Sequence, residues 1–227
     1  MSLVLTGHYY DILKEIGQWK IIAMKSLYKN SPRTIHYSIF SRKIKSLEND
    51  GFIKSIYGPR KSKMLILTEK GASFSPYKEH IYLESMSFNH DLITTNFILN
   101  LKKYPSFTSA QVQSIEVDLE PDGIIYGEKK GKEYSLAVEI ELTQKSKRRV
   151  IDKLCRYKDC PDYTYLLYVF NKESVFKCYR EILINSSKEL SRKVILLLNE
   201  NIDRPKFEYL NSKCFFKSKM TTFEEIF

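Results

Sequence analysis

The sequence lacks the features of membrane proteins, secreted proteins and zinc proteins. No apolar run approaches the roughly 20 residues that a membrane-spanning helix needs. Residues 1–13 lack the basic start, long apolar stretch and cleavage site of a secretory signal. The cysteines, which show none of the close spacing usual in zinc sites, are Cys155, Cys160, Cys178 and Cys214. We therefore expect a cytoplasmic protein with reduced thiols and no membrane contact.

What the sequence has in excess is positive charge. Lysine and arginine number 37 against 27 aspartates and glutamates, which gives a formal net charge of +10. A basic excess of this size favours polyanionic partners, either nucleic acid or anionic membrane. Because many basic proteins bind neither, the positions of the cations carry more information than their number.

The first third of the chain predicts three helices followed by a hairpin. Apolar residues at helical spacing indicate helices over residues 8–16, 19–28 and 33–49. Gly51 then supplies a left-handed helix end, and two short apolar-rich strands follow at residues 53–57 and 63–67. The turn between the strands, residues 58–62, is basic and of hairpin length. Three helices and a hairpin with a basic tip are the element order of a winged helix-turn-helix.

The stretch from Ser41 to Ile53, followed by Leu-Ile-Leu-Thr-Glu-Lys-Gly at residues 65–71, resembles the signature of the winged helix-turn-helix family. In that family the third helix enters the major groove of DNA and the wing tip touches the backbone or the minor groove. The resemblance implies DNA-binding residues on the helix and on the wing, namely Arg33, His36, Ser41, Arg42, Lys45, Arg60, Lys61 and Lys63. The alternatives are a solvated helix face or a winged helix used for protein contacts, and His36 alone fits an ordinary surface histidine.

The rest of the chain predicts a second domain. Residues 76–87 show weaker periodicity and are predicted to link a domain at residues 1–75 to another at residues 88–227. From residue 88 the apolar patterns predict the order αβββαβ, with its first three strands at residues 112–119, 123–126 and 134–142. A further helix and strand follow at residues 173–184 and 193–198. We therefore predict an α+β protein, a winged helix-turn-helix followed by an α/β domain with a mixed central sheet.

Three carboxylates fall at the ends of neighbouring strands in the second domain. Asp122 precedes one predicted strand, and Glu139 and Glu141 lie at the end of the next. Residues two apart on a strand share a face, so Glu139 and Glu141 point the same way and Asp122 can reach them. Converging carboxylates repel one another unless cations relieve them, and oxygen ligands suit Mg²⁺ or Mn²⁺. The alternative is strand carboxylates paired with neighbouring cations and an ordinary Asp-Gly turn.

This pattern, Pro121-Asp122-Gly123 followed by Val138-Glu139-Ile140-Glu141, resembles the PD-(D/E)XK nuclease superfamily and implies a restriction-endonuclease-like domain. The resemblance implies that Asp122 and Glu139 bind a metal ion, which activates a water for attack on a phosphodiester. The next catalytic position is usually lysine, and Glu141 departs from that pattern, which weighs against catalysis more than against the fold. Glutamate occurs there in some restriction enzymes of the superfamily, and Lys145 or Lys147 could act as a displaced lysine.

A basic helix is predicted at residues 146–158, beside the carboxylates. Cations there can hold a phosphate backbone without choosing a sequence, and the helix begins with Lys147, Arg148 and Arg149. Lys153 and Tyr157 stand at i and i+4 on one face of this helix, which is similar to a Gln-x-x-x-Tyr element of some nucleases of this kind.

The layout of the whole chain resembles the replication-relaxation family of plasmid and mobile-element proteins. His90, at the start of a predicted helix, matches the family's histidine, which could flank the acidic site, although a helix-capping or buried histidine fits as well. The resemblance implies a DNA-binding protein of plasmid replication or mobilisation, with metal-dependent endonuclease or nickase activity. The alternatives are a non-catalytic DNA-binding transcriptional or replication regulator with a degenerate nuclease fold, and a protein–protein adaptor.

The sequence also leaves a homodimer open. Four tyrosines could form its interface, although they could equally be core or rim residues: Tyr9, Tyr10, Tyr77 and Tyr82.

Overall fold

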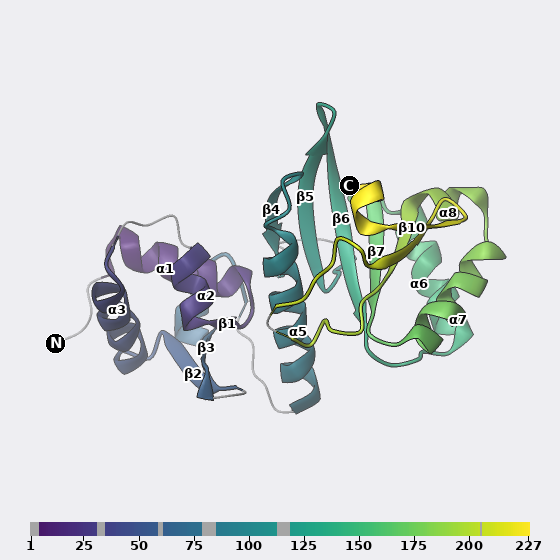
Figure 1. Ribbon diagram of the computed structural model, residues 1–227. Helices are drawn as coiled ribbons and strands as arrows, with labels where there is room; N and C mark the ends of the chain where they lie inside the picture. Colours follow the sequence, from purple (N-terminus) through teal and green to yellow (C-terminus); the bar gives the residue numbers. More distant parts are fainter. Residues whose placement is uncertain (1–4, 31–34, 59–60, 79–84, 113–118, 205) are drawn as a thin grey trace. The chain divides into compact units, whose positions relative to one another are not determined.

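The computed structural model describes residues 5–30, 35–58, 61–78, 85–112, 119–204 and 206–227. They form two compact units, shown in Figure 1, one comprising the described residues up to Thr95 together with Val112, and the other Asn96–Gln111 and the described residues from Leu119 onward. The predicted domain limits stay a prediction, because residues 79–84 of the expected linker lie outside the described residues. In the part of the chain that the structure describes, no helix is long and apolar enough to cross a membrane.

The first unit has the element order predicted for a winged helix. Its elements are α1 (Gly7–Gln18), β1 (Ile22–Ala23), α2 (Met24–Asn30), α3 (Tyr37–Asn49), β2 (Ile53–Tyr57), β3 (Lys63–Leu67), α4 (Glu69–Ala72) and the first part of α5 (Ser85–Leu101). The three strands form an antiparallel sheet in the order β1-β3-β2. Ile12 and Ile16 of α1 and Ile44 of α3 are completely buried, because helical spacing places them on the faces that meet in the core.

The helix predicted over residues 19–28 is wrong in its first half. Ile22 and Ala23 form β1, which pairs with Leu65 and Met64 of β3, and the helix begins only at Met24. Lys20 adopts a φ of 55°, which separates α1 from the strand. The first apolar residues of this stretch therefore belong to the sheet, and only those from Met24 onward belong to the helix.

The second unit has the order αβββαβ from α5 to β7, but its first strand lies at residues 107–111, where no strand was predicted, and most of the strand predicted at residues 112–119 lies outside the described residues. Its elements after α5 are β4 (Phe107–Gln111), β5 (Gly123–Lys129), β6 (Lys132–Glu141), α6 (Lys147–Asp159), β7 (Tyr165–Phe170), α7 (Glu173–Ile184), α8 (Lys188–Lys193), β8 (Val194–Leu198), β9 (Lys213–Phe216), β10 (Lys219–Thr222) and α9 (Phe223–Ile226). The seven strands lie in the order β10-β9-β8-β7-β6-β5-β4. Strands β6, β7 and β8 run parallel and the other neighbours antiparallel, so the central sheet is mixed, as predicted.

One face of this sheet is covered by α6 and α7 (Figure 1). Tyr168 and Phe170 of β7 belong to the same buried cluster as Leu154 and Tyr157 of α6 and Tyr179 of α7. In the ladder between β6 and β7, Glu139 lies beside Tyr168 and Glu141 beside Phe170. Both glutamates therefore lie on the helix-covered face of the sheet.

Candidate functional site

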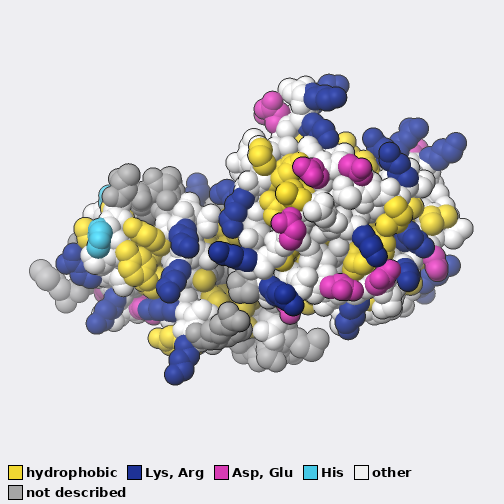
Figure 2. Space-filling view, in the orientation of Figure 1, with side chains coloured by type: hydrophobic (Ala, Val, Ile, Leu, Met, Phe, Trp, Pro, Cys, Tyr) yellow, Lys and Arg dark blue, Asp and Glu magenta, His cyan; other side chains and the backbone are white. Residues whose placement is uncertain are grey.

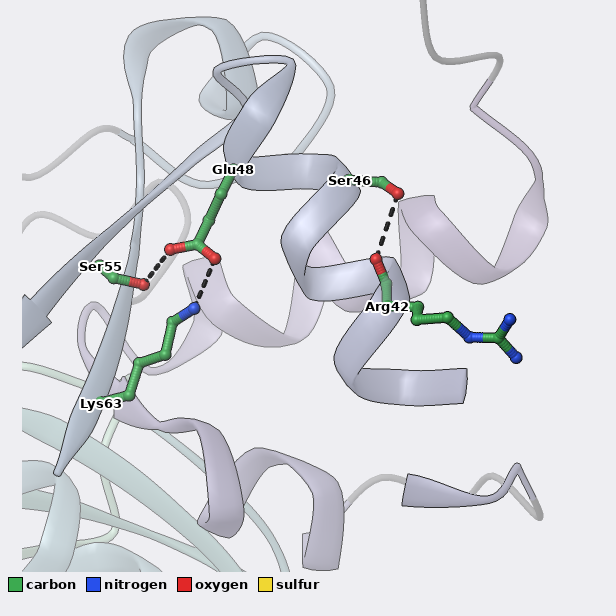
Figure 3. A network of polar contacts seen from close by, with 5 residues as sticks. All are labelled: Arg42, Ser46, Glu48, Ser55 and Lys63. Atoms are coloured by element: carbon green, nitrogen blue, oxygen red, sulfur yellow. Dashed lines mark hydrogen bonds and ion pairs between the residues drawn. The ribbon is translucent and has the colours of Figure 1, made fainter. Parts of the chain in front are cut away.

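The third helix of the first unit carries exposed cations opposite its buried face. Phe40, Ile44 and Leu47 are at most 1% exposed, whereas Arg42 and Lys45 are exposed. Figure 3 shows the Arg42 side chain extending away from the helix, while its backbone carbonyl accepts a hydrogen bond from Ser46 Oγ at 3.1 Å. Neither Arg42 nor Lys45 forms an ion pair with any other described residue. These two cations are therefore available to a polyanionic partner.

The predicted wing cations differ in their contacts. Lys63 Nζ lies 2.5 Å from Glu48 Oε2, and the other carboxylate oxygen of Glu48 accepts a hydrogen bond from Ser55 (Figure 3). Glu48 thus joins α3 to both strands of the hairpin and neutralises Lys63. Lys61 is exposed at the turn, with a φ of 55°.

Of the four remaining predicted DNA-binding residues of this unit, the structure describes two. Arg33 and Arg60 lie outside the described residues. His36 is the N-cap of α3, and its Nδ1 accepts a hydrogen bond from the backbone N–H of Ser38 at 3.3 Å. Ser41 is half-buried on α3. Helix capping accounts for His36 without any DNA contact, and the predicted roles of these residues stay predictions.

In the second unit, the two glutamates of β6 are buried beneath the helices, and Glu139 is hydrogen-bonded to α6. Glu139 is 2% exposed, with Lys153 Nζ 2.5 Å from its Oε2 and with a hydrogen bond from the Tyr157 hydroxyl to its Oε1. Glu141 is 7% exposed and lies near Tyr179 of α7, whose hydroxyl pKa it helps to raise. The i, i+4 spacing of Lys153 and Tyr157 therefore delivers both donors to one carboxylate.

Asp122 lies next to Glu139 at the start of β5. Gly123 pairs with Val138 in the antiparallel ladder, so one step further Asp122 comes opposite Glu139. Asp122 Oδ2 accepts a hydrogen bond from the backbone N–H of Ile140 at 2.7 Å. The structure thus brings the predicted pair of acidic residues together.

The pKa values of this cluster follow from burial. Burial raises the pKa of Glu139 to about 7, and the charge of Asp122 adds to the rise, although Lys153 and Tyr157 lower it. Burial and the charge of Glu139 also raise the pKa of the Tyr157 hydroxyl. Burial and the charge of Glu141 do the same for Tyr179. Both tyrosine hydroxyls therefore stay neutral, while Glu139 changes protonation near neutral pH.

The other predicted site residues of the second unit lie apart from these contacts. Lys145 Nζ is 3.5 Å from Thr143 Oγ1. The basic first turn of α6 is solvent-exposed and consists of Lys147, Arg148 and Arg149, of which Arg148 lies 3.9 Å from Asp152. The cation at Glu139 is Lys153, which the sequence placed both in a helical pair with Tyr157 and among the cations of the basic helix beside the carboxylates. No pattern in the sequence pointed to Tyr179.

The predicted metal ligands Asp122 and Glu139 are already engaged by protein groups, which leaves little room for Mg²⁺ or Mn²⁺. Both oxygens of Glu139 and one of Asp122 already accept hydrogen bonds from protein groups. Among the described residues, no group of three or more His, Cys, Asp or Glu side chains is arranged to hold a metal ion. Since these ions prefer about six oxygen ligands, the residues do not fit a metal unless Lys153 and Tyr157 move away.

Charge on the surface does not by itself single out a site. Figure 2 shows lysine and arginine side chains over both units on the face in view, with acidic and apolar side chains between them. His90, which the sequence placed near the acidic site, lies in the first unit with its Nδ1 3.7 Å from Asp91 Oδ1. A candidate site is therefore identified by the contacts of its residues and not by surface charge alone.

Comparison with known proteins adds little to this geometry. No family model and no curated protein matches the chain, so the resemblance to the replication-relaxation family has no support there. Among solved structures the chain is similar to restriction endonuclease FokI, with 12% identity, 77% of this chain and 40% of that chain covered, and a TM-score of 0.26. It is also similar to restriction endonuclease FokI bound to DNA, with 13% identity, coverage of 88% and 45%, and a TM-score of 0.26. The chain thus spans less than half of these structures, and such TM-scores are too low to equate two folds.

Proposed function

We propose that the chain binds DNA through its first unit, with α3 in the major groove and the β2–β3 hairpin as a wing against the backbone. The observation that carries the proposal is the exposure of three cations, Arg42 and Lys45 on α3 and Lys61 on the wing. None of the three is neutralised by another described residue. They lie on the two elements that a winged helix presents to DNA.

The contacts within this unit support a preorganised surface. Glu48 binds Lys63 and Ser55, so α3 and the hairpin are held together before any ligand arrives (Figure 3). Less conformational freedom is then lost on binding, which favours affinity. Lys45 and Lys61 supply phosphate contacts, and Arg42 is the side chain suited to a guanine edge.

The proposal is tested by comparing two double variants that each lose two positive charges. Arg42→Ala/Lys45→Ala removes the cations of α3, and Lys14→Ala/Lys29→Ala removes exposed lysines of α1 and α2. Affinity for duplex DNA should fall roughly ten- to hundredfold in the first variant and far less in the second. Equal losses in both would mean that net charge, and not α3, governs binding.

For the second unit the geometry favours a non-catalytic role, so that the chain acts as a DNA-binding regulator. Glu141 stands where the nuclease pattern has lysine, and its carboxylate is buried against Tyr179. Both oxygens of Glu139 are engaged by Lys153 and Tyr157. A metal-bound water would need these groups to move, which supports binding without cleavage.

Metal-dependent cleavage is the competing prediction, and one experiment separates the two. Wild type and Glu139→Gln are incubated with supercoiled plasmid in Mg²⁺, Mn²⁺ or EDTA. We expect DNA binding without nicking under all three conditions. Nicking that needs the metal and is lost in Glu139→Gln would establish an endonuclease in place of the regulator.

A further inference from the structure

We infer that the Lys153 ammonium is a built-in counter-cation, which occupies the position beside Glu139 and Asp122 that a divalent metal ion would otherwise take. The inference concerns the second unit alone and goes beyond DNA binding. It holds whether or not α3 contacts DNA.

Lys153 contacts Glu139, which is the least exposed of the three carboxylates in this cluster. Glu139 is 2% exposed, and Lys153 Nζ lies 2.5 Å from its Oε2 while the Lys153 side chain stays 36% exposed. Tyr157, one turn along α6, bonds the other oxygen and is itself completely buried. Leu154 anchors the same stretch of α6 in the core, so the lysine is held over the carboxylate.

The balance of charge explains why a cation is needed there. An ionised carboxylate removed from water is costly unless a cation or hydrogen bonds compensate it. Asp122, just before β5, is close enough for its charge to act on Glu139, and Glu141 is buried two residues further along β6. Lys153 supplies a cation to this cluster through its ion pair with Glu139.

The arrangement of donors suits an ammonium better than a metal ion. An ammonium offers three N–H donors and tolerates a partly exposed position, whereas Mg²⁺ demands about six oxygen ligands at fixed geometry. One Asp122 oxygen is committed to the backbone N–H of Ile140, and one Glu139 oxygen to Tyr157. With the Lys153 ammonium on the other oxygen of Glu139, the described contacts offer a metal ion fewer oxygen ligands than it needs.

Thermal unfolding of the full chain above neutral pH tests the inference, with Mg²⁺, Mn²⁺ or a chelator present. The wild-type Tm should not respond to either metal. Lys153→Met should melt roughly 5–10 °C lower in chelator, because it leaves a buried carboxylate without its cation, and should recover with Mn²⁺. The recovery should disappear in Lys153→Met/Glu139→Gln. The control is Lys147→Met, an exposed lysine of the same helix, which should behave like the wild type.

A calorimetric titration of the wild type and Glu139→Gln with Mn²⁺ provides a second test, which also decides the matter if Lys153→Met does not fold. No Glu139-dependent binding supports the inference. Binding to the wild type that is lost in Glu139→Gln overturns it, as does a folded Lys153→Met that no metal stabilises. DNA is absent from both experiments, so their failure is distinguishable from a failure of DNA binding.

Discussion

Gly17 of α1 lies directly against Tyr77, and a Cβ added to Gly17 would stand 2.7 Å from the Cβ of Tyr77. Tyr77 is 7% exposed, so the segment that follows α4 packs onto α1 and closes the core of the first unit. Of the tyrosines considered for a dimer interface, Tyr77 is therefore a core residue. Tyr10 is 42% exposed, Tyr9 lies under the Lys43 ammonium, and Tyr82 is outside the described residues.

Gly17→Ala should destabilise the first unit by about 1–3 kcal/mol, because the added methyl group overlaps atoms close to the Tyr77 backbone. Urea unfolding followed by the fluorescence of Trp19, the single tryptophan, measures the effect. Gly7→Ala is the matched control, since a Cβ at Gly7 meets nothing within 4 Å. Equal stability of the two variants would show that Tyr77 can move away at no cost.

Lys193→Met should destabilise the second unit by about 1 kcal/mol, because a partly buried carbonyl group and an exposed one lose a donor. Lys193 Nζ donates to the carbonyl of Cys160 at 2.5 Å and to that of Lys158 at 3.4 Å, and so closes the C-terminal end of α6. Thermal unfolding of this variant beside Lys188→Met, an exposed lysine of α8, provides the comparison. A similar Tm for both variants would contradict the role of Lys193 as a cap.

Stability should fall as pH rises from about 4.5 to about 7. The pKa of Glu139 is raised from 4.5 to about 7 in the folded protein, so protons bind the folded state more tightly over this interval. The stabilisation is fully present below the unfolded pKa and is lost as pH rises through the folded one, a change of about 3 kcal/mol. Glu139→Gln should flatten this part of the pH profile of unfolding. An unchanged profile would show that Glu139 ionises normally.

Lys45→Ala and Lys63→Ala should act on different properties. Lys45 has no ion pair among the described residues, so its loss should lower the salt dependence of DNA binding by roughly 0.9 in log–log slope. Lys63 is held by Glu48, so its loss should change the slope less and lower stability by about 1 kcal/mol, a modest value because both side chains are partly exposed. Equal slope changes would mean that Lys63 leaves Glu48 to contact DNA.

Periodicity predicted the elements whose burial is regular. Strands β2 and β3 and helix α7 begin and end at the predicted residues, because each places its apolar side chains on a face that becomes buried. The β9–β10 hairpin was missed for a local reason. Its two-residue turn, Lys217 and Ser218 at φ values of 50° and 63°, has no glycine or asparagine to signal the left-handed conformation.

The candidate site was predictable only where its residues share one element. The shared face of Glu139 and Glu141 follows from the two-residue period of a strand, and the pairing of Lys153 with Tyr157 follows from helical spacing. Contacts between elements depend on how helices and strands pack. The placement of Tyr179 near Glu141 and the ion pair of Lys63 with Glu48 are of that kind, and neither has a local signal.

The salt dependence of duplex DNA binding by the full chain tests the central claim most directly. Released counterions make the logarithm of affinity fall linearly with the logarithm of salt concentration, by roughly 0.9 for each neutralised phosphate. We predict a steep negative slope for the wild type and, for Arg42→Ala/Lys45→Ala, a slope shallower by up to roughly 2 if both cations contact phosphates. An affinity that does not change with salt concentration would contradict DNA binding through α3. A log–log salt slope that is the same in this variant as in the wild type would contradict it too.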